Sequence, residues 1–111
     1  MVNQVLKDEV IQLEADFCAA LSDPNRIFIL YALNDGPLNV TELTNELGVP
    51  QPTISRHLKV LRERGLVFTE RQGTVIIYHI ADGRVIQAMD LLRSAMRDRL
   101  NQRASLVNEL A

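Results

Sequence analysis

The segment QPTISRHLKVLRERG, residues 51–65, constrains the fold of this chain more than any other stretch of the sequence. Its apolar residues recur at the i, i+4 and i+7 spacing of one helix face, namely Ile54, Leu58 and Leu61. Pro52 suits the first helical turn, where a missing N–H costs nothing, and Gly65 ends the run. The segment therefore predicts a helix over residues 51–64 with one buried face.

The outward face of this predicted helix combines two cations with short hydroxyl side chains near its N-terminus. The residues that we expect to contact DNA from this helix are Gln51, Pro52, Thr53, Ser55, Arg56 and Lys59. Such a surface suits phosphates and base edges in the major groove, although an ordinary solvated helix face has a similar composition. For His57, near the inner edge of the helix, packing against a turn and contact with DNA both remain open.

Helices with recognisable start signals precede this segment. Asp23 and Pro24 form an N-cap and a first helical residue. Asn39, followed three residues later by Glu42, resembles a capping box and starts a short helix. Gly48-Val49-Pro50 then breaks the chain before the next helix. Two short helices joined by a brief turn that contains Gly are the signature of a helix-turn-helix.

The hydrophobic period changes from that of a helix to that of a strand after the recognition segment. Two runs rich in Val, Ile, Phe, Tyr and Thr lie within residues 66–80 and predict a β-hairpin. Gly73 supplies the positive φ that a tight hairpin loop needs. Arg71 and Thr74 make the tip basic and polar. A hairpin directly behind a helix-turn-helix is a wing, and we expect both tip residues to contact DNA.

Amphipathic helices are predicted at both ends of the chain, over residues 5–21 and 84–104. The apolar stripes that we expect at a dimer interface are Leu6, Val10, Leu13 and Phe17 on the first helix, and Met89, Leu92, Met96 and Leu100 on the last. Asp82 can cap the last helix, which would be about 30 Å long. So small a protein cannot fully cover a helix of that length with its own chain, and both stripes are wide enough to pair with another chain.

Positive charge is concentrated in one part of the chain, although the formal net charge is −2. Residues 51–80 carry five Lys/Arg against two Asp/Glu, whereas residues 1–50 carry two against eight. The basic part coincides with the predicted recognition helix and wing, which favours double-stranded DNA as the partner. The alternative is a winged helix used for protein–protein contact, which would not need its positive charge at that place.

Composition excludes several other classes of protein. The 111 residues are 47% hydrophobic and 23% charged, which is typical of one globular domain over residues 1–111. No apolar run approaches the ~18 residues of a membrane helix, and no signal-peptide pattern is present, so we expect no membrane partner. The single Cys18 excludes an internal disulfide and favours the cytoplasm. Without a Gly-rich phosphate loop or metalloenzyme spacing, we expect neither catalysis nor a cofactor.

The whole order of elements resembles the ArsR family of winged helix-turn-helix transcriptional regulators. The match is almost position for position over residues 42–61, and residues 21–26, 65–67 and 72–78 resemble the opening of the second helix and the wing. The resemblance implies a mainly α fold with a two-stranded β-hairpin wing, dimerising through the first and last helices. It further implies a homodimer that binds palindromic operator DNA, usually as a repressor.

The inducer sites known in this family are not intact here. Arsenic and cadmium sensors have Cys-x-Cys where this chain has Asn39 and Thr41, and soft metals need thiolates. In the zinc and nickel sensors, the last helix carries an aspartate and a histidine as metal ligands. Asp82 matches the aspartate, but Arg84 stands where the histidine would be. We therefore expect no metal ligands, and the inducer remains unknown. Cys18 leaves two interpretations open, a buried and inert thiol or a thiol-responsive sensor that releases DNA. A metal-responsive sensor that uses Cys18 or a non-standard site is a further alternative for the protein.

Overall fold

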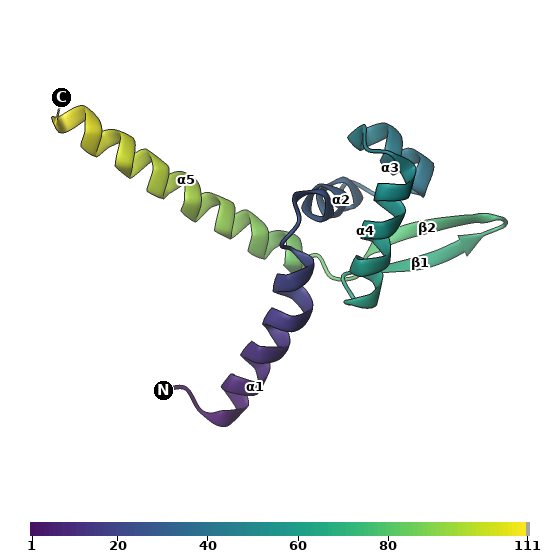
Figure 1. Ribbon diagram of the computed structural model, residues 1–111, viewed down its shortest axis with the longest axis horizontal. Coiled ribbons are helices and arrows are strands. Elements are labelled where there is room, and N and C mark those ends of the chain that lie inside the picture. Colours follow the sequence, from purple (N-terminus) through teal and green to yellow (C-terminus); the bar gives the residue numbers. More distant parts are fainter. Residues whose placement is uncertain (111) are drawn as a thin grey trace.

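A helical body and a β-hairpin make up one side of the molecule, and the two terminal helices project away from the body in different directions (Figure 1). The computed structural model describes residues 1–110. Its elements are α1 (Gln4–Leu13), the π-helical turn η1 (Glu14–Cys18), α2 (Pro24–Asn34), α3 (Val40–Leu47), α4 (Gln51–Glu63), β1 (Val67–Gln72), β2 (Val75–Ile80) and α5 (Arg84–Leu110). This order confirms the predicted fold class, mainly α with a two-stranded wing.

Side-chain caps set the starts of α2 and α3 where the sequence places them. The Asp23 carboxylate accepts a hydrogen bond from the Asn25 backbone N–H at 2.8 Å. The Asn39 side chain accepts from the Glu42 N–H at 2.8 Å, and the Glu42 carboxylate accepts from the Asn39 N–H at 3.0 Å. Gly48 ends α3 with a φ of 65°, a left-handed conformation that glycine adopts without strain. The predicted helix-turn-helix is therefore confirmed down to its caps.

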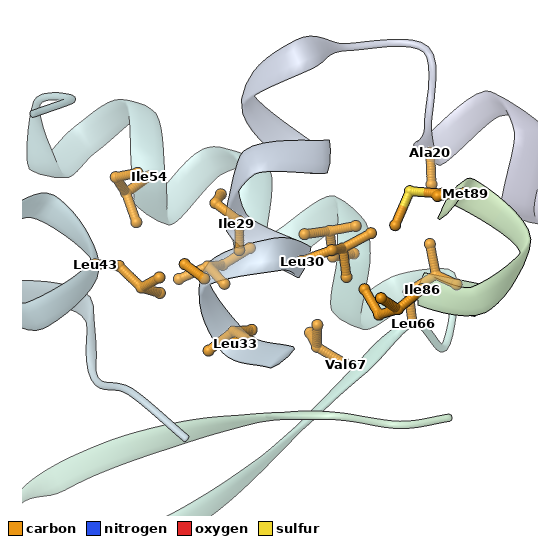
Figure 2. Close-up of a cluster of buried hydrophobic side chains, with 13 residues drawn as sticks. Ala20, Ile29, Leu30, Leu33, Leu43, Ile54, Leu66, Val67, Ile86 and Met89 are labelled. Carbon is orange, nitrogen blue, oxygen red and sulfur yellow. The ribbon is translucent and has the colours of Figure 1, made fainter. Parts of the chain in front are cut away.

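The apolar face of α4 packs into the centre of the core. Ile54, Leu58 and Leu61 are each 0% exposed. They pack with residues of α2, α3, the base of the wing and the start of α5, including Ile29, Leu30, Leu33, Leu43, Leu66, Val67 and Ile86 (Figure 2). Burying a side chain of this size contributes about 1.5–3 kcal/mol. Three such anchors fix the rotation of α4 about its own axis, so its opposite face must point to solvent.

Met89 lies in this core, although it also lines the cavity at the predicted dimer surface. Its side chain is only 5% exposed and packs beside Ile86 and Ala20 (Figure 2). The first turns of α5 lie against the body, and the helix leaves the body only beyond them (Figure 1). An apolar stripe shows which side of a helix is covered but not whether its own chain or a second copy covers it. The place of Met89 in the dimer interface therefore stays a prediction, because its own chain already buries most of the side chain.

The wing is an antiparallel hairpin in which Gln72 lies opposite Val75. Gly73 takes a φ of 64° in the tight turn between them, as the sequence predicts. A contact that the sequence did not predict joins the wing to the body: Leu38 donates to the Tyr78 carbonyl at 3.2 Å and accepts from the Tyr78 N–H at 2.8 Å. The wing is thus anchored to the segment that leads into α3.

The first and last helices expose apolar side chains over most of their length. Seven of the eight predicted interface residues are exposed, namely Leu6, Val10, Leu13, Phe17, Leu92, Met96 and Leu100. α5 runs to Leu110, beyond the predicted end at residue 104, and the first helix changes to π-type hydrogen bonding at Glu14. Within residues 1–110, no helix has a stretch long and apolar enough to cross a membrane.

Candidate nucleic-acid interface

The outward face of α4 carries the polar side chains that the sequence predicts for DNA contact. The structure leaves Gln51, Pro52, Ser55, Arg56 and Lys59 exposed and Thr53 half-buried. This exposure follows from the core, because Ile54 and Leu58 hold the other side of the helix completely buried. The face therefore presents donors and cations on a rigid helix, as major-groove contact requires.

The N-terminal half of α4 adds positive potential to that face. Pro50 occupies the cap position, and no side chain caps the first turn, in contrast to α2 and α3. Pro52 has no N–H, and the Thr53 and Ile54 N–H groups donate to the Pro50 carbonyl at 3.0 and 3.1 Å, so the helix dipole is what favours an anion at this end. Within residues 1–110, Arg56 and Lys59 take part in none of the ion pairs, so both charges are available to a polyanion.

His57 does not belong to this face, so of the two roles that the sequence leaves open, packing and DNA contact, its burial favours packing. The residue is 4% exposed and lies on the inner side of α4. Its Nδ1 is 3.2 Å from an Arg26 guanidinium nitrogen. Because a guanidinium can only donate, Nδ1 is the acceptor, and the ring proton sits on Nε2, 3.9 Å from the Asp23 carboxylate. The signal was present in the sequence, since His57 follows Ile54 by three residues and so shares its side of the helix.

Burial keeps the His57 imidazole neutral. Desolvation is the largest cause that lowers the pKa of His57 below its usual value, and the cations Arg26 and Arg56 lower it further. The Asp23 carboxylate opposes this shift but does not reverse it. A neutral ring can keep accepting the hydrogen bond from Arg26, so the residue links α4 to α2.

The wing tip presents the two predicted residues, Arg71 and Thr74, at the surface. The Arg71 side chain is oriented by its own turn, because its Nε donates to the Gly73 carbonyl at 3.0 Å. Within the described residues 1–110, the remaining guanidinium N–H groups of Arg71 have no partner and are available to a second acceptor. This geometry suits a phosphate oxygen better than a fixed pattern of base atoms.

A groove between the start of α3 and the wing was not predicted. It has a volume of about 240 Å³ and is lined by Asn39, Val40, Thr41, Thr74, Val75 and Ile76. The strand that follows the turn and the capped N-terminus of α3 meet there because the Leu38–Tyr78 bridge brings the wing against this part of the chain. No local pattern could reveal the groove, because its two walls lie far apart in the sequence.

A larger cavity lies between the first helix and α5, within the predicted dimer surface. Its volume is about 560 Å³, and its apolar walls include Leu13, Phe17, Val85 and Leu92. Cys18 also lines this cavity and is exposed in the single chain, so the rest of its own chain does not bury the thiol. Cys18 lies in an apolar helix, as the sequence predicts, but this helix projects from the body, and no other element of the described chain covers the thiol.

Two residues that match metal-ligand positions of the resembled family have other partners. The Asn39 side chain accepts from the Glu42 N–H as the cap of α3. Asp82 accepts from the Arg84 backbone N–H at 2.9 Å, and the Arg84 guanidinium donates to both its carboxylate oxygens. These hydrogen bonds lower the pKa of Asp82 to about 2. Among residues 1–110, no three His, Cys, Asp or Glu side chains gather as metal ligands would.

Comparison with known families and relatives agrees with this geometry. Residues 23–69 match the family described as "Bacterial regulatory protein, arsR family". The HTH-type transcriptional regulator NmtR of Mycobacterium tuberculosis is 44% identical over 71 residues, which cover 64% of this chain and 59% of that protein. The uncharacterised HTH-type transcriptional regulator MJ1325 of Methanocaldococcus jannaschii is 38% identical over 85 residues, 76% of this chain and 96% of that one. The chain thus spans little more than half of NmtR but nearly all of MJ1325.

Solved structures share the arrangement of helices and wing. The homodimeric winged helix-turn-helix DNA-binding domain Mb0332 of Mycobacterium bovis superposes with a TM-score of 0.75 at 28% identity, covering 86% of this chain and 89% of that one. The transcriptional repressor BigR of Xylella fastidiosa superposes with a TM-score of 0.67 at 34% identity, covering 80% and 87%. Both superpositions cover at least 80% of this chain and so extend well beyond the helix-turn-helix.

Proposed function

Because this chain belongs to the arsR family of bacterial regulatory proteins, we propose that it is a homodimeric transcriptional repressor that binds operator DNA through α4 and the wing. The observation that carries the proposal is the outward face of α4, where Arg56 and Lys59 are exposed and unpaired within residues 1–110. The proposed role is regulatory and not catalytic, and its place is the cytoplasm, where operator DNA lies.

Different parts of the interface have different proposed roles. Gln51, Thr53, Ser55 and Arg56 read base edges in the major groove, where each good bidentate contact is worth ~1–3 kcal/mol. Lys59 and the wing tip neutralise phosphates and set the register of the protein on the duplex. Burial of Ile54 and Leu58 supports the use of this whole face in binding, because it points the polar side of α4 outward as a unit.

The proposed dimer forms through the exposed stripes of the first helix and α5. Seven large apolar side chains of these stripes lie uncovered in a single copy of the chain, namely Leu6, Val10, Leu13, Phe17, Leu92, Met96 and Leu100. A two-fold axis through this surface would present two α4 helices to successive major grooves about 34 Å apart. The operator is accordingly an inverted repeat.

The proposed regulator does not use the two metal sites common in its family. Asn39 and Asp82 already serve as helix caps, and the Arg84 cation holds the Asp82 carboxylate. A metal at either position would have to displace these hydrogen bonds and would meet an amide or a cation where a thiolate or imidazole is needed.

Salt-dependent binding to operator DNA is the direct test of this function. We expect the dimer to bind the DNA upstream of its own gene more tightly than random DNA, with an affinity that falls steeply as salt rises. Lys59→Ala should reduce the slope of log affinity against log salt by roughly two, because each dimer loses two phosphate contacts. Fluorescence anisotropy over a series of salt concentrations measures both quantities.

Lys7→Ala is the matched control, because Lys7 is an exposed cation on α1 and not on α4 or the wing, which form the proposed DNA interface. It should leave the salt slope unchanged. Binding that is indifferent to salt would contradict DNA recognition and favour a winged helix used for protein–protein contact. A monomer in gel filtration at micromolar concentration would contradict the dimer.

Arg71→Ala tests the role of the wing separately. The Gly73 carbonyl holds one side of the Arg71 guanidinium, and we expect the other side to contact a DNA phosphate. Because phosphates carry no sequence information, Arg71→Ala should weaken binding equally on operator and random DNA. The salt slope should fall by about one for each protomer. Competition assays with both DNAs measure the ratio, and a loss confined to the operator would mean that the wing reads sequence.

A further inference from the structure

Two arginines join the helix-turn-helix to the backbone of the first helix. Arg26, on α2, donates through Nε to the Ala20 carbonyl at 2.6 Å and through a terminal nitrogen to the Ala19 carbonyl at 3.3 Å. The same guanidinium donates to the His57 ring of α4 at 3.2 Å. One planar group thus holds the end of the first helix and the underside of the recognition helix at once.

The second arginine, Arg64, follows α4 directly and reaches the π-helical turn η1. One terminal nitrogen donates to the Ala15 carbonyl at 3.0 Å and lies 3.3 Å from the Asp16 carboxylate. In an α-helix, the Ala19 N–H would bond to the Ala15 carbonyl, but here it bonds to the carbonyls of Glu14 and Asp16. Arg64 therefore supplies a donor to a carbonyl that has lost its usual α-helical partner.

A π-type turn within an α-helix is rare and is frequently associated with function. This one lies where the first helix changes from the projecting segment α1 to the part that contacts the body (Figure 1). It also faces the apolar cavity through Phe17 and Cys18. The turn that Arg64 holds is thus part of the surface proposed for dimerisation.

We propose that Arg26 and Arg64 are positioning residues, which fix the orientation of α4 relative to the first helix and so relate the dimer interface to the DNA interface. This inference rests on the proposed DNA binding. Two recognition helices can enter successive major grooves only if their spacing matches the duplex. α4 is about 20 Å long, so a tilt of about 6° at its Arg64 end displaces its N-terminal end by about 2 Å. Such a shift exceeds the tolerance of direct base contacts.

Arg64 is not a DNA cation under this assignment, although it belongs to the basic part of the sequence. Its guanidinium is engaged by the backbone of η1 and by Asp16, on the side of the body where the first helix packs. An ion pair exposed to this extent contributes little to stability, so its effect should appear in DNA affinity more than in unfolding.

The test compares Arg64→Ala with Arg62→Ala in the full-length dimer. Arg62 is an exposed cation on the same helix end and makes no ion pair within residues 1–110, so it controls for charge alone. We expect Arg64→Ala to lower operator affinity roughly three- to thirty-fold with an unchanged salt slope, and Arg62→Ala to change operator affinity much less. Amide exchange over residues 14–18 should become faster in Arg64→Ala alone.

Asp16→Asn provides a second variant that leaves all cations in place. If the effect passes through this contact, the losses from Asp16→Asn and Arg64→Ala should not add in the double variant. A salt slope that falls in Arg64→Ala as in Lys59→Ala would overturn the proposal, because it would make Arg64 a phosphate contact. Equal behaviour of Arg62→Ala and Arg64→Ala would overturn it too. Amide exchange needs no DNA. It therefore tests the contact between Arg64 and η1 even if the protein does not bind DNA, so the two proposals can fail separately.

Discussion

Replacing Leu92 with glutamate is expected to convert the homodimer into monomers and to weaken operator binding by about 10²–10⁴-fold. Leu92 is 69% exposed in the single chain and lies on the apolar stripe of α5 beside the cavity formed with the first helix. In a two-fold interface the substitution places a carboxylate in both copies, where burying an unpaired charge is costly. The loss of affinity arises because each monomer then holds only one half-site.

Analytical ultracentrifugation and anisotropy with the operator measure the two effects together. Gln87→Glu is the matched control, because it adds the same charge at an exposed, polar position of α5. It should remain dimeric and bind as the wild type does. If Leu92→Glu stays dimeric at micromolar concentration, the two protomers meet through a different surface and the proposed interface is wrong.

Leu58→Ala should destabilise the protein by about 2–5 kcal/mol, the usual cost of truncating a buried leucine. Leu58 is 0% exposed and anchors the middle of α4, so its loss leaves a cavity beneath the recognition helix. For a chain of this size the melting temperature should fall by more than about 8 °C. Circular dichroism during heating, at one fixed protein concentration, measures the change.

Lys59→Ala separates stability from DNA contact in the adjacent residue. Its side chain is exposed, so its melting temperature should stay within about 2 °C of the wild type while its DNA affinity falls. If both variants melt at the wild-type temperature, Leu58 is not an anchor of the core, and the burial argument for the outward face of α4 fails with it.

Much of the DNA-binding unit could be predicted from the sequence because its signals are local. The spacing of Ile54, Leu58 and Leu61 repeats with the turn of a helix, so it defines α4 and its buried side without any knowledge of the core. The capping box of Asn39 and Glu42 and the positive φ of Gly73 likewise depend on neighbours within a few residues. Each of these predictions was confirmed for this reason.

The outcome for the site residues is mixed, and the cause differs from one residue to the next. His57 shares the side of α4 that carries Ile54, so a stricter count of helical positions would have placed it inside. Met89 offered no such signal, because the stripe on α5 is continuous and only the packing of its first turns against the body separates Met89 from Leu92.

The sequence by itself determined the helix-turn-helix, the wing and the polar face of α4, since each follows from periodicity, capping or turn chemistry over short distances. Only the tertiary structure decided how these parts are joined: the Leu38–Tyr78 bridge, the Arg26–His57 contact and the hydrogen bond from Arg64 to the π-helical turn. The physical reason is that a hydrogen-bonding group can find its partner anywhere in the chain. Its choice depends on which distant segments the buried core brings within about 3 Å of each other.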